Sequence, residues 1–183
     1  MNADSALQRL VEGNINYVSD KENVDTSVGI RSSLVSGQSP YAIILSCADS
    51  RVIPESIFDA NAGQIFVCRV AGNIANTSTI ASIEYAVAHL GTKLIMVLGH
   101  ESCGAVTAAI SGVKASPSLA HLLEQIDPAV QFCDSSEVNE VVKCNAQLTA
   151  KEILNKSEII RNSEGIKIVS GFYNLSSGLV DII

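Results

Sequence analysis

Three short, continuous apolar runs constrain the fold of this chain more than any other feature. They are YAIILS at 41–46, IFVCRV at 65–70 and LIMVL at 94–98. Runs of this length without alternating polar residues are typical of strands buried on both faces, as in a parallel sheet. Between the last two runs, residues 79–90 place apolar side chains at helical spacing and stop at Gly91. This order predicts an α/β fold with a mostly parallel central sheet flanked by helices.

Helical periodicity and turn residues predict the remaining elements. We expect helices at 4–18, 30–35, 103–110, 119–126, 147–156 and 157–162. Residues 134–140 are polar and predict a surface loop or the start of a helix. The run at 166–173 is predicted to be a strand, followed by a hairpin with Gly178 at its turn and 179–183 beyond it. No linker or repeat interrupts the chain, so we expect a single domain over residues 1–183.

Composition argues against several function classes. The chain has 12 Lys and Arg against 19 Asp and Glu, and its cations do not cluster. Because binding to phosphates requires such a cluster, we expect no nucleic-acid partner. No apolar run approaches the roughly 18 residues of a membrane span, so we expect no membrane association. The first residues lack the basic and apolar parts of a signal peptide, which predicts a cytoplasmic location.

The five cysteines are odd in number and accompany no secretion signal. We therefore expect thiols rather than a disulfide framework. Cys68, Cys133 and Cys144 are interpreted as small apolar core residues, since reactivity would require a basic neighbour. His89 is interpreted as a packing or helix-capping residue and His121 as a solvated helix residue.

Two polar segments directly follow the first and third apolar runs: CADSR at 47–51 and GHESCG at 99–104. In open α/β sheets, binding sites form outside the carboxyl ends of the strands, so Cys47, His100 and Cys103 can converge. Two thiolates and one imidazole are good zinc ligands, and three protein ligands leave a fourth position for water or substrate. The helix expected from Cys103 onward also favours the thiolate form of that residue. The sequence therefore predicts a catalytic zinc site.

The paired segments resemble the C-x-D-x-R … H-x-x-C signature of β-class carbonic anhydrases. The similarity extends over nearly the whole chain, including ALQRLVEGN at 6–14, GQIFVCRVAGN at 63–73 and GIKIVSGFYNLSSGLVDI at 165–182. It implies a zinc lyase (a carbonate dehydratase) that reversibly converts carbon dioxide to bicarbonate and a proton by zinc-bound hydroxide. It also implies a homodimer or a multiple of dimers, such as a tetramer, with the N-terminal helix packed on a partner subunit.

The resemblance also implies roles for the residues of the two segments. Cys47, His100 and Cys103 would be the zinc ligands. Asp49 and Arg51 would form a catalytic dyad, in which Arg51 holds the Asp49 carboxylate and the carboxylate accepts a proton. An Asp49 side chain released by arginine could instead bind zinc as a fourth ligand, which gives an inactive form in some members of the family.

The implied substrate site extends beyond these segments. Gln38 matches a glutamine that hydrogen-bonds the substrate, and Phe66 and Tyr85 match aromatic residues of a small apolar pocket completed by the adjoining subunit. Gly104 matches a glycine whose backbone N–H could face a substrate oxygen. Arg69 matches an arginine that helps to build an inhibitory bicarbonate site with a tryptophan in one subgroup. This chain has no tryptophan, so we expect that inhibitory site to be absent.

Three alternatives remain. A few relatives use the same scaffold to hydrolyse carbonyl sulfide or carbon disulfide, and pocket width would decide between these substrates and carbon dioxide. A non-catalytic zinc-binding or scaffold protein would have four closed ligands and no Asp/Arg dyad, whereas Asp49 and Arg51 are present here. A thiol redox protein would carry a C-x-x-C motif, and the chain has none.

Overall fold

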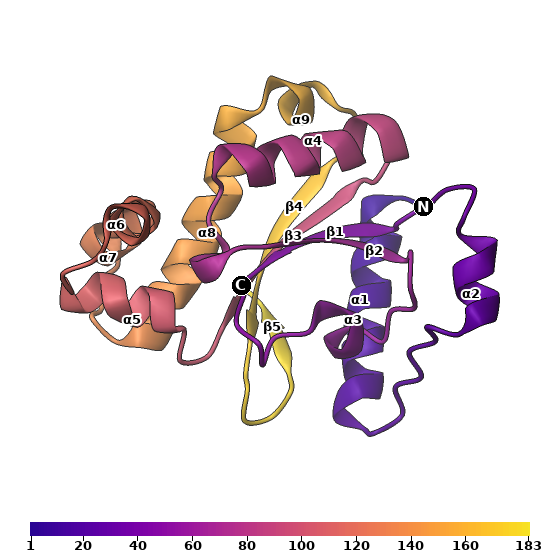
Figure 1. The fold of residues 1–183 in the computed structure, drawn as a ribbon, viewed down its shortest axis with the longest axis horizontal. Coiled ribbons are helices and arrows are strands. Elements are labelled where there is room, and N and C mark those ends of the chain that lie inside the picture. The colour runs from indigo at the N-terminus through magenta and orange to yellow at the C-terminus, as the bar shows by residue number, and fades with distance from the viewer.

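The three apolar runs form adjacent parallel strands in the computed structural model, which describes all 183 residues (Figure 1). The five strands of the sheet lie in the order β2-β1-β3-β4-β5. The parallel strands are β1 (Ala42–Ser46), β2 (Ile65–Arg69), β3 (Leu94–His100) and β4 (Lys167–Tyr173). The last strand, β5 (Val180–Ile182), pairs antiparallel with β4 through the predicted hairpin. The expected α/β fold with a mostly parallel sheet is confirmed.

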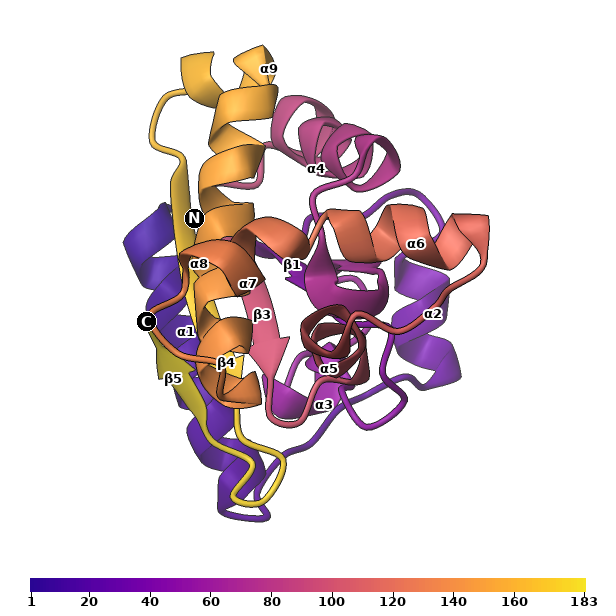
Figure 2. The same cartoon turned by 90° about the vertical axis from the view of Figure 1, so that its left-hand side faces the viewer.

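Helices cover both faces of the sheet. They are α1 (Ala3–Val18), α2 (Val28–Ser33), α3 (Pro54–Ile57), α4 (Thr77–Leu90), α5 (Gly104–Ser111), α6 (Pro117–Glu124), α7 (Asp127–Phe132), α8 (Val138–Lys156) and α9 (Glu158–Asn162), with a short 3₁₀ helix, η1 (Ala71–Asn73). Figure 1 shows α4 and α9 above the sheet and α1 and α3 below it. Figure 2 shows α8 alongside β3 and β4. None of the helices combines the length and the apolar character that crossing a membrane would require.

Alternate residues of β1 enter two separate apolar cores. Ile44 packs with α1 and α3 on one face of the sheet. Ile43 and Leu45 pack with α4, α8 and α9 on the other face. All three side chains are fully buried, which explains why this strand is apolar without alternation.

A third apolar core lies at the carboxyl ends of β1, β3 and β4. It is formed by α5, α6, α7 and the first half of α8, and Figure 1 shows these helices together on one side of the molecule. Cys47 and Cys103 belong to this core. The helices between β3 and β4 therefore pack against Cys47 and Cys103, two of the three predicted metal ligands.

Helix α8 begins at Val138, well before the expected start of the helix at 147. Its first half buries Asn145, and its second half buries Thr149, so polar side chains interrupt the apolar stripe that would have marked the helix in the sequence. The short helices α3 and α7 were not expected either, because four and six residues are too few to show a period.

Helix α1 packs on the sheet of its own chain. Ala6 and Leu10 are buried against β1 and β3, and the side chain of Asn2 caps the helix by accepting the backbone N–H of Ser5 at 2.8 Å. Its other side leaves Val11 and Ile15 exposed. The packing of this helix on a partner subunit stays a prediction.

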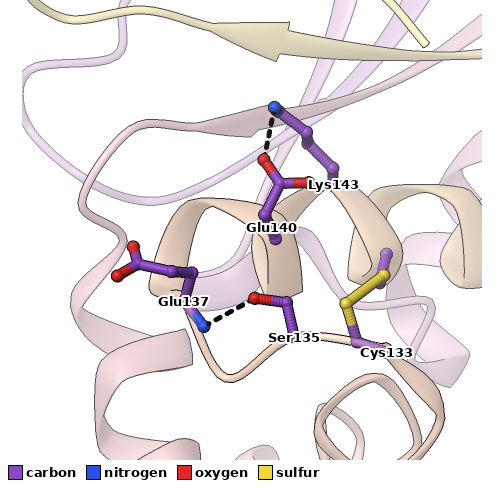
Figure 3. The surroundings of a disulfide bond; sticks show 6 residues. Cys133, Ser135, Glu137, Glu140 and Lys143 are labelled. Carbon is purple, nitrogen blue, oxygen red and sulfur yellow. Dashed lines mark hydrogen bonds and ion pairs between the residues drawn. A yellow bond between two sulfur atoms is a disulfide. The ribbon is translucent and has the colours of Figure 1, made fainter.

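The interpretation of Cys133 and Cys144 as unpaired core thiols is wrong. The two residues form a disulfide bond between the end of α7 and the first half of α8, with their Cα atoms 6.0 Å apart (Figure 3). Beside the bond, Ser135 Oγ accepts the backbone N–H of Glu137 at 3.1 Å in the turn that leads into α8. Both cysteines are partly buried at the border of the third core. The sequence did not indicate this pair, because only the docking of α7 on α8 brings the two thiols together.

We expect the disulfide to stabilise the folded chain. Its closed loop spans a sequence separation of 11 residues. Loop-closure entropy in the unfolded state then predicts that Cys133→Ser combined with Cys144→Ser lowers the free energy of unfolding by about 2–3 kcal/mol. Urea denaturation measures this change. Dithiothreitol should destabilise the wild type by a similar amount and leave the double variant unchanged; a wild type indifferent to reduction would contradict the prediction.

The close approach of α1 to α3 gives a second prediction. A Cβ at Gly13 would overlap the backbone carbonyl of Phe58, so Gly13→Ala must displace one helix from the other. We expect a loss of about 1–3 kcal/mol in the free energy of unfolding. Gly29 in α2 is the matched control, since the nearest atom to an added Cβ is Ser27 Oγ at 3.8 Å. Gly29→Ala should leave stability unchanged or raise it by up to about 1 kcal/mol; equal losses in both variants would refute the packing argument.

Candidate metal centre

The three predicted metal ligands come together at the carboxyl edge of the sheet. Cys47 follows β1, His100 is the last residue of β3, and Cys103 is the N-cap of α5. Their ligand atoms all lie within 4.8 Å of one another. The three residues are 4%, 0% and 1% exposed, respectively. The structure therefore brings together the cluster that the paired motif predicts.

The turn between His100 and Cys103 aims both side chains at one point. Ser102 has a φ of +54°, in the left-handed region, which reverses the chain between β3 and α5. Its backbone N–H is held by the side-chain oxygen of Asn139 at 2.9 Å. The spacing H-x-x-C thus corresponds to one tight, supported turn.

The ring of His100 is oriented to offer one nitrogen to a metal. Its Nδ1 lies 2.9 Å from the backbone carbonyl of Glu101, so Nδ1 carries the proton and donates it. The other nitrogen, Nε2, is buried and has no hydrogen-bond partner. An unpaired buried acceptor costs about 1–3 kcal/mol, and a metal ion bound to Nε2 would remove that cost. The unpaired Nε2 of His100 is the feature of the site that best fits a metal ligand.

The two thiols act as a pair. The pKa of Cys47 is lowered to about 4, chiefly because the Cys103 thiol donates a hydrogen bond to the Cys47 thiolate. The backbone N–H of Gly72 also donates to Cys47 Sγ, at 3.4 Å. The pKa of Cys103 is raised, chiefly because its thiol proton is held in the hydrogen bond to Cys47, and further because burial and the neighbouring thiolate disfavour a second negative charge. A divalent cation would neutralise both thiolates, and two thiolates with one imidazole suit zinc.

Asp49 and Arg51 form a bidentate ion pair beside this cluster. Arg51 Nε donates to one carboxylate oxygen at 2.9 Å, and Nη2 donates to the other at 2.7 Å. This hydrogen bonding holds the pKa of Asp49 far below its usual range. Asp49 Oδ2 lies 3.9 Å from Nε2 of His100, so the carboxylate reaches the edge of the cluster while it remains paired with arginine. The Asp49 and Arg51 side chains are 18% and 51% exposed, respectively, so the pair lies between the buried cluster and solvent.

Arg69 has a supporting contact that sequence reasoning missed. From the end of β2, its Nε donates to the carbonyl of Cys47 at 3.0 Å and its Nη2 donates to the carbonyl of Asp49 at 2.6 Å. The guanidinium therefore braces the backbone of the segment CADSR. The parallel pairing of β1 with β2, which places Ser46 opposite Arg69, is what creates this contact.

The predicted substrate residues do not all lie at this cluster. Gln38 precedes β1 at the opposite end of the strand and is exposed. Phe66 is paired with Ile43, about 13 Å of extended chain before Cys47. Tyr85 on α4 packs beside Phe66, with ring centroids 6.4 Å apart, and is 49% exposed.

Gly104 is the one predicted substrate residue adjacent to a ligand. It follows Cys103 as the first residue of α5, and it is exposed. An added Cβ would find nothing within 4 Å. Within one chain, the structure thus separates Gln38, Phe66 and Tyr85 from the cluster and keeps Gly104 beside it.

The other interpreted residues lie outside the cluster. Cys68 is buried in β2, and burial raises its pKa to about 11, as expected of a packing thiol. His121 is exposed on α6, 3.6 Å from a carboxylate oxygen of Glu124. His89 lies in the last turn of α4, with its ring centroid 5.2 Å from that of Tyr85.

Comparison with known proteins gives consistent results. Residues 42–180 match the family model described as carbonic anhydrase. The chain is 36% identical to carbonic anhydrase 2 of Mycobacterium tuberculosis, covering 97% of this chain and 91% of the relative. It is 33% identical to a carbonic anhydrase of Mycolicibacterium smegmatis, and the match covers 99% of this chain and 93% of the relative. Among solved structures, tetrameric β-carbonic anhydrases of the fungus Sordaria macrospora superpose with a TM-score of 0.77 at 25% identity, covering 98% of this chain and 97% of theirs.

The cluster predicts stoichiometric metal binding. The purified chain should carry about one zinc ion per chain, and Cys103→Ser should lose it because two donors hold the ion far less tightly than three. Cys68→Ser is the matched control, since it alters a buried thiol that lies outside the cluster and should retain the metal. Elemental analysis after dialysis measures both. Full zinc content in Cys103→Ser would remove that residue from the ligand set.

Proposed function

The chain belongs to the β-carbonic anhydrase family, whose members are carbonate dehydratases, and on that premise we propose that it is a zinc enzyme that interconverts carbon dioxide and bicarbonate. The single observation that carries the proposal is the buried Cys47, His100 and Cys103 cluster with the unpaired Nε2 of His100. Three donors of this kind leave a coordination position open, which a structural four-ligand site would not.

The proposed roles follow from what each side chain contacts. Cys47, His100 and Cys103 would hold zinc, which lowers the pKa of water and so supplies a nucleophile near neutral pH. Arg51 occupies both carboxylate oxygens of Asp49 from one side and fixes its orientation. The remaining lone pairs of Asp49 can accept a proton next to Nε2 of His100.

The surroundings of the cluster suit an uncharged substrate. Apolar residues of the third core pack around Cys47 and Cys103, among them Ile74, Val106 and Phe172. Carbon dioxide is small and apolar, so it can occupy an apolar site without losing hydrogen bonds to water. Gly104 would offer its backbone N–H to an oxygen of the substrate.

We further propose that Gln38, Phe66 and Tyr85 act in the site of a neighbouring subunit. All three are exposed or only partly buried, and they lie away from the ligands of their own chain. A homodimer or tetramer would place them at a partner's cluster. The solved relatives from Sordaria macrospora are tetrameric, which supports an oligomer.

The alternatives carry less support. Nothing in the comparisons supports hydrolysis of carbonyl sulfide or carbon disulfide as the principal activity. A non-catalytic scaffold leaves the Asp49–Arg51 pair at the cluster unexplained. The disulfide joins Cys133 to Cys144 rather than the thiols of the cluster, so it gives no support to a dithiol redox centre there.

The cytoplasmic location remains part of the proposal. Disulfides persist mainly in oxidising compartments and are rare in the cytosol. In a reducing cytoplasm, the disulfide between Cys133 and Cys144 would be open to reduction. Cys47 and Cys103 would be protected from oxidation there by the bound metal.

The dyad gives the test of the mechanism. Asp49→Ala and Arg51→Ala should each retain about one zinc per chain, because neither residue is in the ligand set, and should lose about 10²–10⁴-fold in turnover. Stopped-flow hydration of carbon dioxide with a pH indicator measures the loss, and parallel turnover of carbonyl sulfide identifies the preferred substrate. Glu140→Gln, which removes an exposed ion pair with Lys143, is the control and should match the wild type. Wild-type rates in both dyad variants would exclude the dyad from the mechanism.

A further inference from the structure

Helix α8 contributes no metal ligand, but it contacts the segments that carry His100 and Cys103 and the 3₁₀ helix η1 that donates to Cys47. Asn145, 2% exposed, donates from its side-chain amide to the carbonyl of Gly72 at 2.8 Å. The backbone N–H of Gly72 in turn donates to Sγ of Cys47 at 3.4 Å. A continuous path of two hydrogen bonds therefore leads from α8 to the first ligand.

The same helix supports the segment of Cys103. The side-chain oxygen of Asn139 accepts the backbone N–H of Ser102 at 2.9 Å. Ser102 is the left-handed residue of the turn, and its carbonyl accepts a hydrogen bond from Arg51 Nη2 at 3.4 Å. Asn139 therefore holds the turn that carries Cys103 and, through Ser102, the position of the Arg51 guanidinium.

Between these residues, Val142 lies against the end of β3. A Cβ added at Gly99 would come within 2.7 Å of a methyl carbon of Val142, so the strand reaches His100 in close contact with α8. Asn139, Val142 and Asn145 are spaced three residues apart, which aligns them along one side of the helix. The disulfide at Cys144 fixes this part of α8 to α7.

We propose that Asn139 and Asn145 are positioning residues, which hold the ligand segments at the spacing that zinc requires. This inference rests on the proposed metal site. Partners that orient metal ligands from outside the coordination sphere typically contribute about ten- to a hundredfold in metal affinity. The two side chains act with opposite polarity, since Asn145 donates to a carbonyl and Asn139 accepts from an N–H.

Because of this difference, replacing asparagine by aspartate should have opposite outcomes at positions 139 and 145. An aspartate keeps the acceptor and loses the donor, so Asn139→Asp should bind zinc as the wild type does. Asn145→Asp, Asn145→Ala and Asn139→Ala should bind zinc about ten- to a hundredfold more weakly. Competition with a chromogenic chelator measures the affinity. The thiolate-to-metal absorption of the Co²⁺-substituted protein should shift in the weakened variants and not in Asn139→Asp.

Ser170→Ala separates positioning from general stability. Ser170 Oγ donates to the carbonyl of Ala146 at 3.2 Å, so this variant also removes a buried hydrogen bond to α8, one residue from Asn145. It should destabilise the metal-free protein to urea by an amount similar to Asn145→Ala while keeping wild-type zinc affinity and cobalt absorption. Zinc affinity that falls equally in all variants, or in none of them, would overturn the inference. A wild type that binds neither zinc nor cobalt would instead refute the proposed metal site.

Discussion

Parallel pairing of β1 with β3 fixes where the chain leaves the sheet. Ser46 lies opposite Leu98, so Cys47 and His100 emerge side by side at one edge. A slip of one residue would turn every side chain of β1 to the other face and remove Cys47 from the cluster. Burial on both faces of the sheet supports this register, since Ala42 and Ile44 pack into one apolar core and Ile43 and Leu45 pack into the other.

The polar atoms buried at this edge of the sheet find only some of their hydrogen-bond partners in the surrounding backbone. The thiolate of Cys47 receives the N–H of Gly72, and the ring of His100 is held through Nδ1. Nε2 of His100 has no partner and the second thiol cannot readily ionise. A bound cation would resolve both, so we expect metal binding to stabilise this part of the fold.

The proposed dyad has a different environment from the proposed ligands. Asp49 and Arg51 are partly exposed at the rim of the cluster, in contact with solvent. The ligands lie beneath them, where a low dielectric strengthens their interactions with a cation. Arg69 and α8 connect the two layers. Arg69 donates to the backbone carbonyls of both Cys47 and Asp49, and Asn139 of α8 holds Ser102, whose carbonyl accepts a hydrogen bond from Arg51.

Local sequence patterns determined most of the strands of this protein and the residues of its candidate metal site. The apolar runs predicted the strands, and the polar segments that follow two of them predicted that Cys47, His100 and Cys103 converge. The resemblance to a known family implied the pairing of Asp49 with Arg51. Only the tertiary structure decided which distant residues support them. Arg69 reaches Cys47 through the pairing of two strands, Asn145 reaches Gly72 through the docking of a helix, and Cys133 meets Cys144 where α7 packs on α8. Such contacts depend on register and docking, which are set by the packing of the whole chain and leave no local periodicity in the sequence.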